Sequence, residues 1–474
     1  MRPLEVGLVV VTAVVVLWPL VRTSRIIGAA VAFGGVAVAV LQAVIEGARW
    51  QVAPIYALLA VVLGWRVARI GGDKTAGPRI VSIAGGAVVL ALAALLMAAL
   101  PVPALPQPEG PNLVGTTAWI AVDTARPDRL SPAFTASQPP PAQREVVVQA
   151  WYPTAVDGDP APWVADAAAF AEQLAPEVGL PVFTLGHLSH TRMGATADVP
   201  IAPGQWPIVV YSHGWGGFRT VQSDLAEHLA SHGYVVISLD HTYGSNASIF
   251  PSGPVFGADE SDLAGQVIGQ NPAALPELED VGGDAYVAAT TLLEQTFAED
   301  VAVVLDQIAE GDHPDLLGTL DTSQVGLTGH STGGGAMVRL CLTDDRCAGV
   351  FGLDPWVEPV PGELLSEGLD DPLVSLRSEE WDGNDNDQVL RALHEGSPGD
   401  RGLFVIPGAN HQDFTLQPFL SPLAGPLGLS GPGDDAEIHD AVDRLAQAFF
   451  DQIFSDDGGD LLAEPPAPIQ ADDP

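Results

Sequence analysis

The chain has 474 residues and a formal net charge of −40 at neutral pH, from 19 basic and 59 acidic side chains. A surface this acidic repels phosphate backbones, so the composition argues against a nucleic-acid-binding protein. The charge is divided unevenly: residues 1–100 carry eight basic and three acidic residues, and the rest of the chain carries 11 basic and 56 acidic residues. The chain therefore has two regions of different character.

Four apolar segments fill the first hundred residues, at 5–21, 26–45, 52–67 and 80–100. Each is close to the roughly 20 residues that a helix needs to cross the apolar core of a bilayer. The first segment lacks a convincing cleavage site and three more segments follow it, so we do not interpret it as a signal peptide. We expect residues 1–100 to form a transmembrane region of about four helices that anchors the chain.

Basic residues near the ends of these segments predict the orientation of the region. Those at or after the ends of the first and third segments are Arg22, Arg25, Arg66, Arg69, Lys74 and Arg79. In contrast, only Arg2 precedes the first segment, and only Arg49 lies between the second and the third. Loops rich in basic residues stay in the cytoplasm, so both termini are predicted to lie outside. The expected location is the cell membrane, multi-pass, with the chain after residue 100 extracytoplasmic.

Residues 101–117 are rich in proline and are predicted to form a stiff spacer. Beyond it, apolar runs typical of strands alternate with helical patterns in a domain that we expect to span residues 118–454. The expected strands are 118–122, 145–151, 206–212, 234–240, 325–328, 349–353, 373–376 and 402–406. The expected helices are 220–231, 289–309, 335–342, 388–395 and 436–454. Such alternation predicts a mostly parallel, doubly wound α/β sheet with helices on both faces.

Two further segments and a pair of cysteines stand out from this pattern. Residues 249–285 are rich in Gly, Pro and Asp and form a candidate lid, and residues 455–474 are predicted to be a disordered acidic tail. Cys341 and Cys347 lie six residues apart. They either form a small-loop disulfide, which would suit a location outside the cytoplasm, or remain buried thiols.

The histidines and cysteines do not make a persuasive metal site. His228 and His232 stand four residues apart on a predicted helix and could share a metal, but no third ligand lies near them in the sequence. The spacing of the two cysteines matches no zinc pattern. We therefore expect neither a metal nor another cofactor.

The stretch Gly329-His330-Ser331-Thr332-Gly333 lies between a predicted strand and a predicted helix. A serine between two glycines at such a turn is the signature of a nucleophile elbow, in which small neighbours allow a strained backbone that lifts the hydroxyl above the sheet. The alternative is a glycine-rich turn whose serine only caps a helix.

Nucleophilic attack by Ser331 needs a base, an acid that orients the base, and donors for the oxyanion. His411, which follows the expected strand 402–406, is the predicted base. Asp354 and Asp382 each follow a strand between the serine and the histidine, so either could be the acid. The predicted oxyanion donors are the N–H groups of Trp215, in a glycine-rich loop, and of Thr332. His213, in the same loop, is predicted to be structural.

Several stretches of the chain resemble one known family. They are GPNLVG at 110–115, SHGWGGFRT at 212–220, LASHGY at 229–234, GHSTGG at 329–334 with LDPW at 353–356, and HQDF at 411–414. Together they resemble the platelet-activating-factor acetylhydrolase family of α/β-hydrolases, of the secreted plasma type. The resemblance implies an α/β-hydrolase fold and selects Asp354 as the acid. Thr332 stands where the family has an aromatic residue, and the candidate lid matches poorly.

We therefore expect a membrane-anchored serine ester hydrolase with the triad Ser331, His411 and Asp354. The resemblance implies that its substrates are lipids or small esters, in particular phospholipids with short or oxidised sn-2 acyl chains. One alternative is a general carboxylesterase or polyester hydrolase, which would use the later acid position at Asp382. The other is an inactive hydrolase domain that serves adhesion or sensing at the cell surface.

Overall fold

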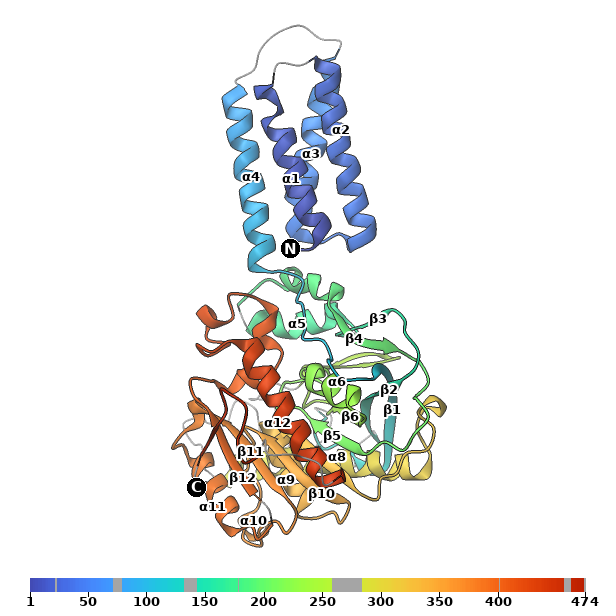
Figure 1. Ribbon diagram of the computed structural model, residues 1–474, viewed down its shortest axis with the longest axis vertical. Coiled ribbons are helices and arrows are strands. Elements are labelled where there is room, and N and C mark those ends of the chain that lie inside the picture. The colour runs from blue at the N-terminus through green and yellow to red at the C-terminus, as the bar shows by residue number, and fades with distance from the viewer. Residues whose placement is uncertain are drawn as a thin grey trace.

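A bundle of long helices stands on one side of an α/β domain in the computed structural model (Figure 1). The structure describes residues 1–21, 24–70, 79–131, 143–177, 179–257, 284–399, 401–455 and 462–472. Most of the candidate lid at 249–285 lies outside these residues. Of that segment, the structure describes part of a hairpin made by β7 (Ala247–Phe250) and β8 (Gly253–Phe256), and the start of a long helix.

The helical bundle consists of α1 (Pro3–Leu17), α2 (Arg25–Gln42), α3 (Ala53–Ala68) and α4 (Arg79–Ala99). With short extensions, these four helices are long and apolar enough to cross a membrane, which confirms the prediction of about four such helices. Side chains such as Leu8, Ile55 and Leu59 pack inside the bundle. Others, such as Phe33 and Val61, are exposed on its outer surface, where a lipid environment would be favourable.

A buried ion pair joins the helices at the end of the bundle nearest the α/β domain. Arg49 Nε and Nη2 donate to the two carboxylate oxygens of Glu5, at 2.7 and 2.8 Å. Arg49 Nη1 also donates to the carbonyl oxygen of Leu100, at 2.7 Å, where the chain leaves α4. One guanidinium thus ties the start of α1 to the exit of α4.

The α/β domain packs directly against this end of the bundle. The ring of Trp50 meets that of Phe183 edge-on, with centroids 5.3 Å apart, and Trp50 Nε1 donates to the carbonyl oxygen of Thr184 at 3.0 Å. Ser421 Oγ donates to the carbonyl oxygen of Ala99 at 2.6 Å. The domain is therefore docked on the bundle and is not simply tethered by the proline-rich segment.

Among the described residues, eleven strands form one sheet in the order β13-β12-β11-β10-β9-β5-β6-β2-β1-β4-β3. The strands are β1 (Leu113–Pro127), β2 (Gln143–Thr154), β3 (Pro160–Pro162), β4 (Arg192–Ala197), β5 (Ile208–Ser212), β6 (Val235–Asp240), β9 (Val325–His330), β10 (Cys347–Leu353), β11 (Leu373–Ser378), β12 (Arg401–Ile406) and β13 (Gln470–Ala471). Strands β6, β5, β9, β10, β11 and β12 pair in parallel, whereas β2 joins β6 and β1 antiparallel. The mostly parallel sheet confirms the predicted fold class.

Helices cover both faces of this sheet (Figure 1). On one face lie α5 (Ala167–Glu177), α6 (Ser223–Ser231) and α12 (Asp435–Ser455), and on the other lie α8 (Asp284–Glu310), α9 (Thr332–Cys341) and α11 (Asp385–Gly396). Alternation along β5 supplies both layers, since Val209 packs toward the first set and Val210 toward the second. Each fully buried aliphatic side chain of this kind stabilises the fold by about 1.5–3 kcal/mol.

Two boundaries differ from the sequence-based expectations. Strand β1 begins at Leu113, inside the range 101–117 that was predicted to be a spacer. The acidic tail is also ordered where the structure describes it, because β13 pairs with β12 and Ile469 is only 4 % exposed. Asp472 adds an ion pair with Arg391 at 2.8 Å. The prediction of a disordered tail is therefore wrong for residues 462–472.

Candidate active site

Ser331 occupies a strained turn between β9 and α9, with φ 54° and ψ −124°. Only small neighbours allow this turn, because a Cβ at Gly333 would collide with the carbonyl oxygens of Ser212 and His213. Although Ser331 is the N-cap residue of α9, its side chain makes no capping hydrogen bond. The turn therefore has the geometry of a nucleophile elbow and not that of a simple capping serine.

Asp354, and not Asp382, lies against His411. His411 Nδ1 donates to Asp354 Oδ2 at 2.9 Å, and Asp354 is only 1 % exposed. The main-chain N–H of Ser378 donates to Asp354 Oδ1 at 2.7 Å, and its hydroxyl donates to Oδ2. Asp382 is 65 % exposed and faces Arg377 at 3.5 Å. Because Asp354 accepts a hydrogen bond from Nδ1–H of the ring, the proton of the neutral imidazole stays on Nδ1 and His411 keeps Nε2 free to act as a base.

Two aromatic rings flank His411. Trp381 stacks on the imidazole with centroids 4.2 Å apart and planes 12° from parallel. The ring of His330 lies 4.3 Å from it, and His330 Nε2 donates to the carbonyl oxygen of His411 at 2.9 Å. Burial lowers the pKa of His330 well below its usual value, so this ring is neutral. The main-chain N–H of His411 donates to Glu380 Oε2 at 2.7 Å. These contacts fix the loop that carries the predicted base.

The sequence-based reasoning missed Trp381 and Glu380, although both precede Asp382 in a segment that had been weighed for the acid. An aromatic residue three positions after the end of β11, at the same edge of the sheet as the serine, was the available signal. Since His330 immediately precedes Ser331, its contacts bring the serine and His411 to one place. Within the described ranges no hydrogen bond joins Ser331 Oγ to His411 Nε2, a contact that often tightens only when substrate binds.

The loop after β5 lies directly against the serine. A Cβ at Gly214 would be 2.9 Å from the Cβ of Ser331. The N–H of Gly216 donates to the carbonyl oxygen of Gly244 at 2.9 Å, which holds the far side of the loop. In the part of the chain that the structure describes, the N–H groups of Trp215 and Thr332 have no acceptor. Thr332 opens α9, where the N–H groups are free and the helix dipole favours negative charge.

His213 and the pair His228 and His232 have structural partners. His213 Nδ1 donates to the carbonyl oxygen of Gly214 at 2.7 Å, and burial lowers the pKa of His213 to about 3. His228 Nε2 lies 2.9 Å from Gln447 Oε1, and His232 Nδ1 lies 2.9 Å from the carbonyl oxygen of His228. The protein itself thus occupies these ring nitrogens.

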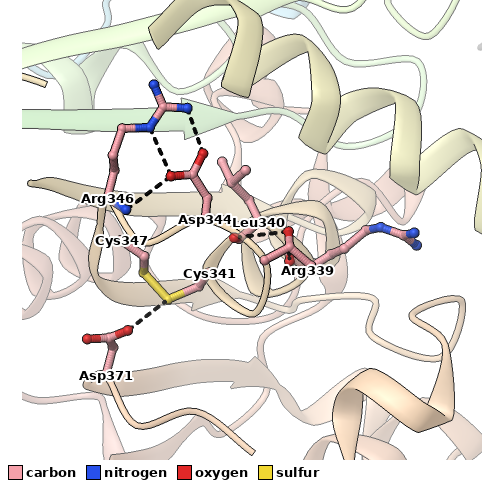
Figure 2. The surroundings of a disulfide bond; sticks show 8 residues. Arg339, Leu340, Cys341, Asp344, Arg346, Cys347 and Asp371 are labelled. Atoms are coloured by element: carbon pink, nitrogen blue, oxygen red, sulfur yellow. Dashed lines mark hydrogen bonds and ion pairs between the residues drawn. A yellow bond between two sulfur atoms is a disulfide. The ribbon is translucent and has the colours of Figure 1, made fainter. Parts of the chain in front are cut away.

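Cys341 and Cys347 form a disulfide, shown in Figure 2. Of the two alternatives that the sequence left open, the structure has the bridge. It links the end of α9 to the start of β10 and so ties the helix that follows Ser331 to the strand that leads to Asp354. Asp371 Oδ2 lies 3.9 Å from Cys341 Sγ, but a bridged sulfur is no thiolate ligand, so this group does not fit a metal ion.

A protein-family model, described as platelet-activating factor acetylhydrolase, isoform II, matches residues 105–252 and 287–457. A platelet-activating factor acetylhydrolase from Cavia porcellus is 26% identical over 270 residues, 56% of this chain and 61% of that protein. The one from Bos taurus is 28% identical over 218 residues, 44% of this chain and 48% of the relative. The chain thus spans less than two thirds of these relatives.

Two further proteins to which the chain is similar are described as esterases. A probable 1-alkyl-2-acetylglycerophosphocholine esterase from Arthroderma benhamiae is 27% identical over 163 residues, 34% of each chain. Among solved structures, a ferulic acid esterase from Streptomyces cinnamoneus superposes with a TM-score of 0.60 at 24% identity. The superposition covers 79% of this chain and 99% of that one, which shows the shared α/β-hydrolase fold.

Proposed function

The chain belongs to the platelet-activating factor acetylhydrolase, isoform II family of carboxylic ester hydrolases, and from this premise we propose a membrane-anchored enzyme that hydrolyses phospholipids. Its substrates carry short or oxidised acyl chains at sn-2. Ser331, His411 and Asp354 form the catalytic triad, and Trp215 and Thr332 provide the oxyanion hole. The observation that supports this most strongly is the hydrogen bond between His411 and the buried Asp354.

In the first half of the reaction, Ser331 Oγ attacks the ester carbonyl while His411 Nε2 takes its proton. Asp354 accepts the hydrogen bond from Nδ1–H and stabilises the imidazolium that forms. The N–H groups of Trp215 and Thr332 donate to the oxygen that becomes negative. His411 then protonates the departing alcohol, and a water activated by the same ring hydrolyses the acyl-enzyme.

This mechanism is tested by comparing the wild-type enzyme with its Ser331→Ala variant on phospholipids of graded sn-2 chain length. The expected result is fast release of short or oxidised chains by the wild type, and a loss of at least ~10³-fold in the variant. Ser189→Ala, which changes an exposed serine far from the elbow in sequence, is the matched control and should retain full activity. Equal activity of the wild type and Ser331→Ala would refute the mechanism.

We further propose that both termini and the α/β domain lie outside the cytoplasm. The basic residues near the ends of the first and third helices support this, and so does the disulfide, because disulfides persist in oxidising compartments. Protease added to intact cells should then digest the chain after residue 101. Full protection of the domain would place it in the cytoplasm.

A further inference from the structure

A second Ser–His–Asp chain begins at Ser212, the last residue of β5, directly before the loop that carries Trp215, which we call the oxyanion loop. Ser212 Oγ is 3.0 Å from His241 Nε2, and His241 Nδ1 is 3.0 Å from Asp300 Oδ2. Ser212 and His241 are fully buried, and Asp300 is 1 % exposed. The ring of His241 also stacks on Phe297, with centroids 3.8 Å apart. The hydrogen bonds repeat the order found in the proposed catalytic triad, but all three side chains are buried away from solvent.

The charges around this chain determine which atom carries each proton. Arg144 donates to both oxygens of Asp300 at 2.7 Å. Burial alone would raise the pKa of Asp300, but the guanidinium outweighs it and the pKa is lowered, so the carboxylate is ionised. Burial lowers the pKa of His241, so its ring is neutral. His241 therefore donates from Nδ1 to Asp300 and accepts at Nε2 from the hydroxyl of Ser212.

These hydrogen bonds do not make Ser212 a second nucleophile. It is the last residue of β5 and lacks the positive φ of Ser331. With no exposed surface, its hydroxyl cannot meet an ester. What the hydrogen bond from Ser212 to His241 does is hold the end of β5 at one position relative to α8, which carries Asp300.

Ser212, which His241 and Asp300 hold in place, is the residue from which the oxyanion loop starts. The carbonyl oxygen of Ser212 lies against Gly333 of the elbow, and the next residue but one, Gly214, lies against Ser331. The other end of the loop depends on the same histidine, because the main-chain N–H of Gly244 donates to the carbonyl oxygen of His241. Gly244 in turn accepts from the N–H of Gly216. His241 is therefore linked to the loop directly at Ser212, before Trp215, and through Gly244 at Gly216, after it.

We infer that Ser212, His241 and Asp300 are positioning residues that aim the N–H of Trp215 at the developing oxyanion. This inference rests on the proposed ester hydrolysis by Ser331. An oxyanion hole acts through donors fixed at the place where charge develops. A small displacement of Trp215 therefore reduces the stabilisation of the transition state more than it reduces the binding of substrate. The buried Ser–His–Asp chain is thus a support for the catalytic one.

The test compares Ser212→Ala with Ser375→Ala in the full-length protein in detergent, with p-nitrophenyl acetate as the ester. Ser375 also makes a buried hydrogen bond to a histidine, at 2.9 Å from His394 Nε2, but on β11. Both variants lose one buried Ser–His bond and should lose similar thermal stability. Only Ser212→Ala should lose kcat, by about 10- to 100-fold, with KM within about twofold.

A transition-state analogue provides a readout that a loss of stability would not move. The inhibition constant of an alkyl trifluoromethyl ketone, whose adduct with Ser331 is a tetrahedral oxyanion, should rise by the same factor as kcat/KM falls. His241→Asn should give the same loss, because its amide can still donate toward Asp300 but does not reach Ser212. If Ser212→Ala does not fold, His241→Asn carries the same test.

Two outcomes would overturn the inference, and they differ. If the wild type and Ser331→Ala are equally inactive, the proposed hydrolysis is refuted and the positioning role with it. If the wild type is active and Ser331→Ala is not, but Ser212→Ala and His241→Asn keep kcat within twofold of Ser375→Ala, only the positioning role is refuted. If the double variant Ser212→Ala/His241→Asn loses no more kcat than either single variant, the two residues act through one contact.

Discussion

Replacing Asp354 with asparagine tests the identity of the catalytic acid and the direction of its hydrogen bonds. Oδ1 of Asp354 accepts the main-chain N–H of Ser378, so the amide oxygen of Asp354→Asn takes that place. The amide nitrogen then occupies the position of Oδ2, which in the wild type accepts from His411 Nδ1 at 2.9 Å. Since a donor now faces Nδ1, the imidazole must keep its proton on Nε2 and cannot take one from Ser331.

The magnitude follows from this change of tautomer. A serine hydrolase whose histidine holds the wrong tautomer loses about 10⁴-fold in kcat, or ~5 kcal/mol of transition-state stabilisation. Asp382→Asn is the matched control, because Asp382 is 65 % exposed and its nearest partner, Arg377, is 3.5 Å away. Because the Asp382 carboxylate is exposed to water, its ion pair with Arg377 contributes at most ~1 kcal/mol to stability, and kcat should change by less than about twofold.

The assay measures kcat for p-nitrophenyl acetate in both variants, with the thermal midpoint of each as a check on folding. Labelling by a fluorophosphonate gives a second reading, since Ser331 should react slowly in Asp354→Asn and normally in Asp382→Asn. A loss of activity in Asp382→Asn with Asp354→Asn active would refute the assignment. It would also favour the alternative of a general carboxylesterase that uses the later acid position.

Three further changes probe the surroundings of the site. Trp381→Leu should lower kcat by about 3- to 30-fold in the same assay, since the stacked indole faces the positive charge that develops on the ring of His411 in the transition state; unchanged kcat would exclude this role. Cys341→Ser opens the disulfide and should cost about 2 kcal/mol, seen as a thermal midpoint ~3 °C lower, and no shift would show that the bridge adds no stability. Burial alone would lower the pKa of His439, but Asp224 outweighs it and raises the pKa. The ion pair between His439 and Asp224 therefore stabilises the fold fully below about pH 6.5, and this stabilisation is lost as the pH rises through the raised pKa of His439. In His439→Asn the thermal midpoint should fall less steeply above about pH 6.5 than in the wild type. An equally steep fall in both would assign the pH dependence to other groups.

The candidate triad was predictable because its chemistry dictates both residue types and chain order. A buried apolar strand followed by small residues around Ser331 indicates an elbow from the sequence alone. The position of His411 after the last expected strand follows from the way parallel strands place their carboxyl ends at one edge. Asp354 and Asp382 could not be separated from the residues themselves, because each follows a strand. In the folded chain only Asp354 of the two lies within hydrogen-bonding distance of His411.

Features that depend on contacts distant in sequence were not predictable. Strand β13 has two residues, too few for any periodicity to show, and its pairing with β12 depends on a chain that returns from α12. The chain of Ser212, His241 and Asp300 joins residues up to 88 positions apart, which lie on β5, directly after β6 and on α8. Only the assembled sheet brings such groups within hydrogen-bonding distance.

The contact between the bundle and the α/β domain changes how the rate of the enzyme should be expressed. Trp50 and Ser421 hold the domain against the end of the helices, and Ser421 lies ten residues after His411. With the helices in a bilayer, as proposed, the site would stay at one height above the lipids, and the proposed phospholipid substrate would reach it by lateral diffusion in a plane. Turnover should then follow the mole fraction of substrate in that leaflet and stay constant when the suspension is diluted.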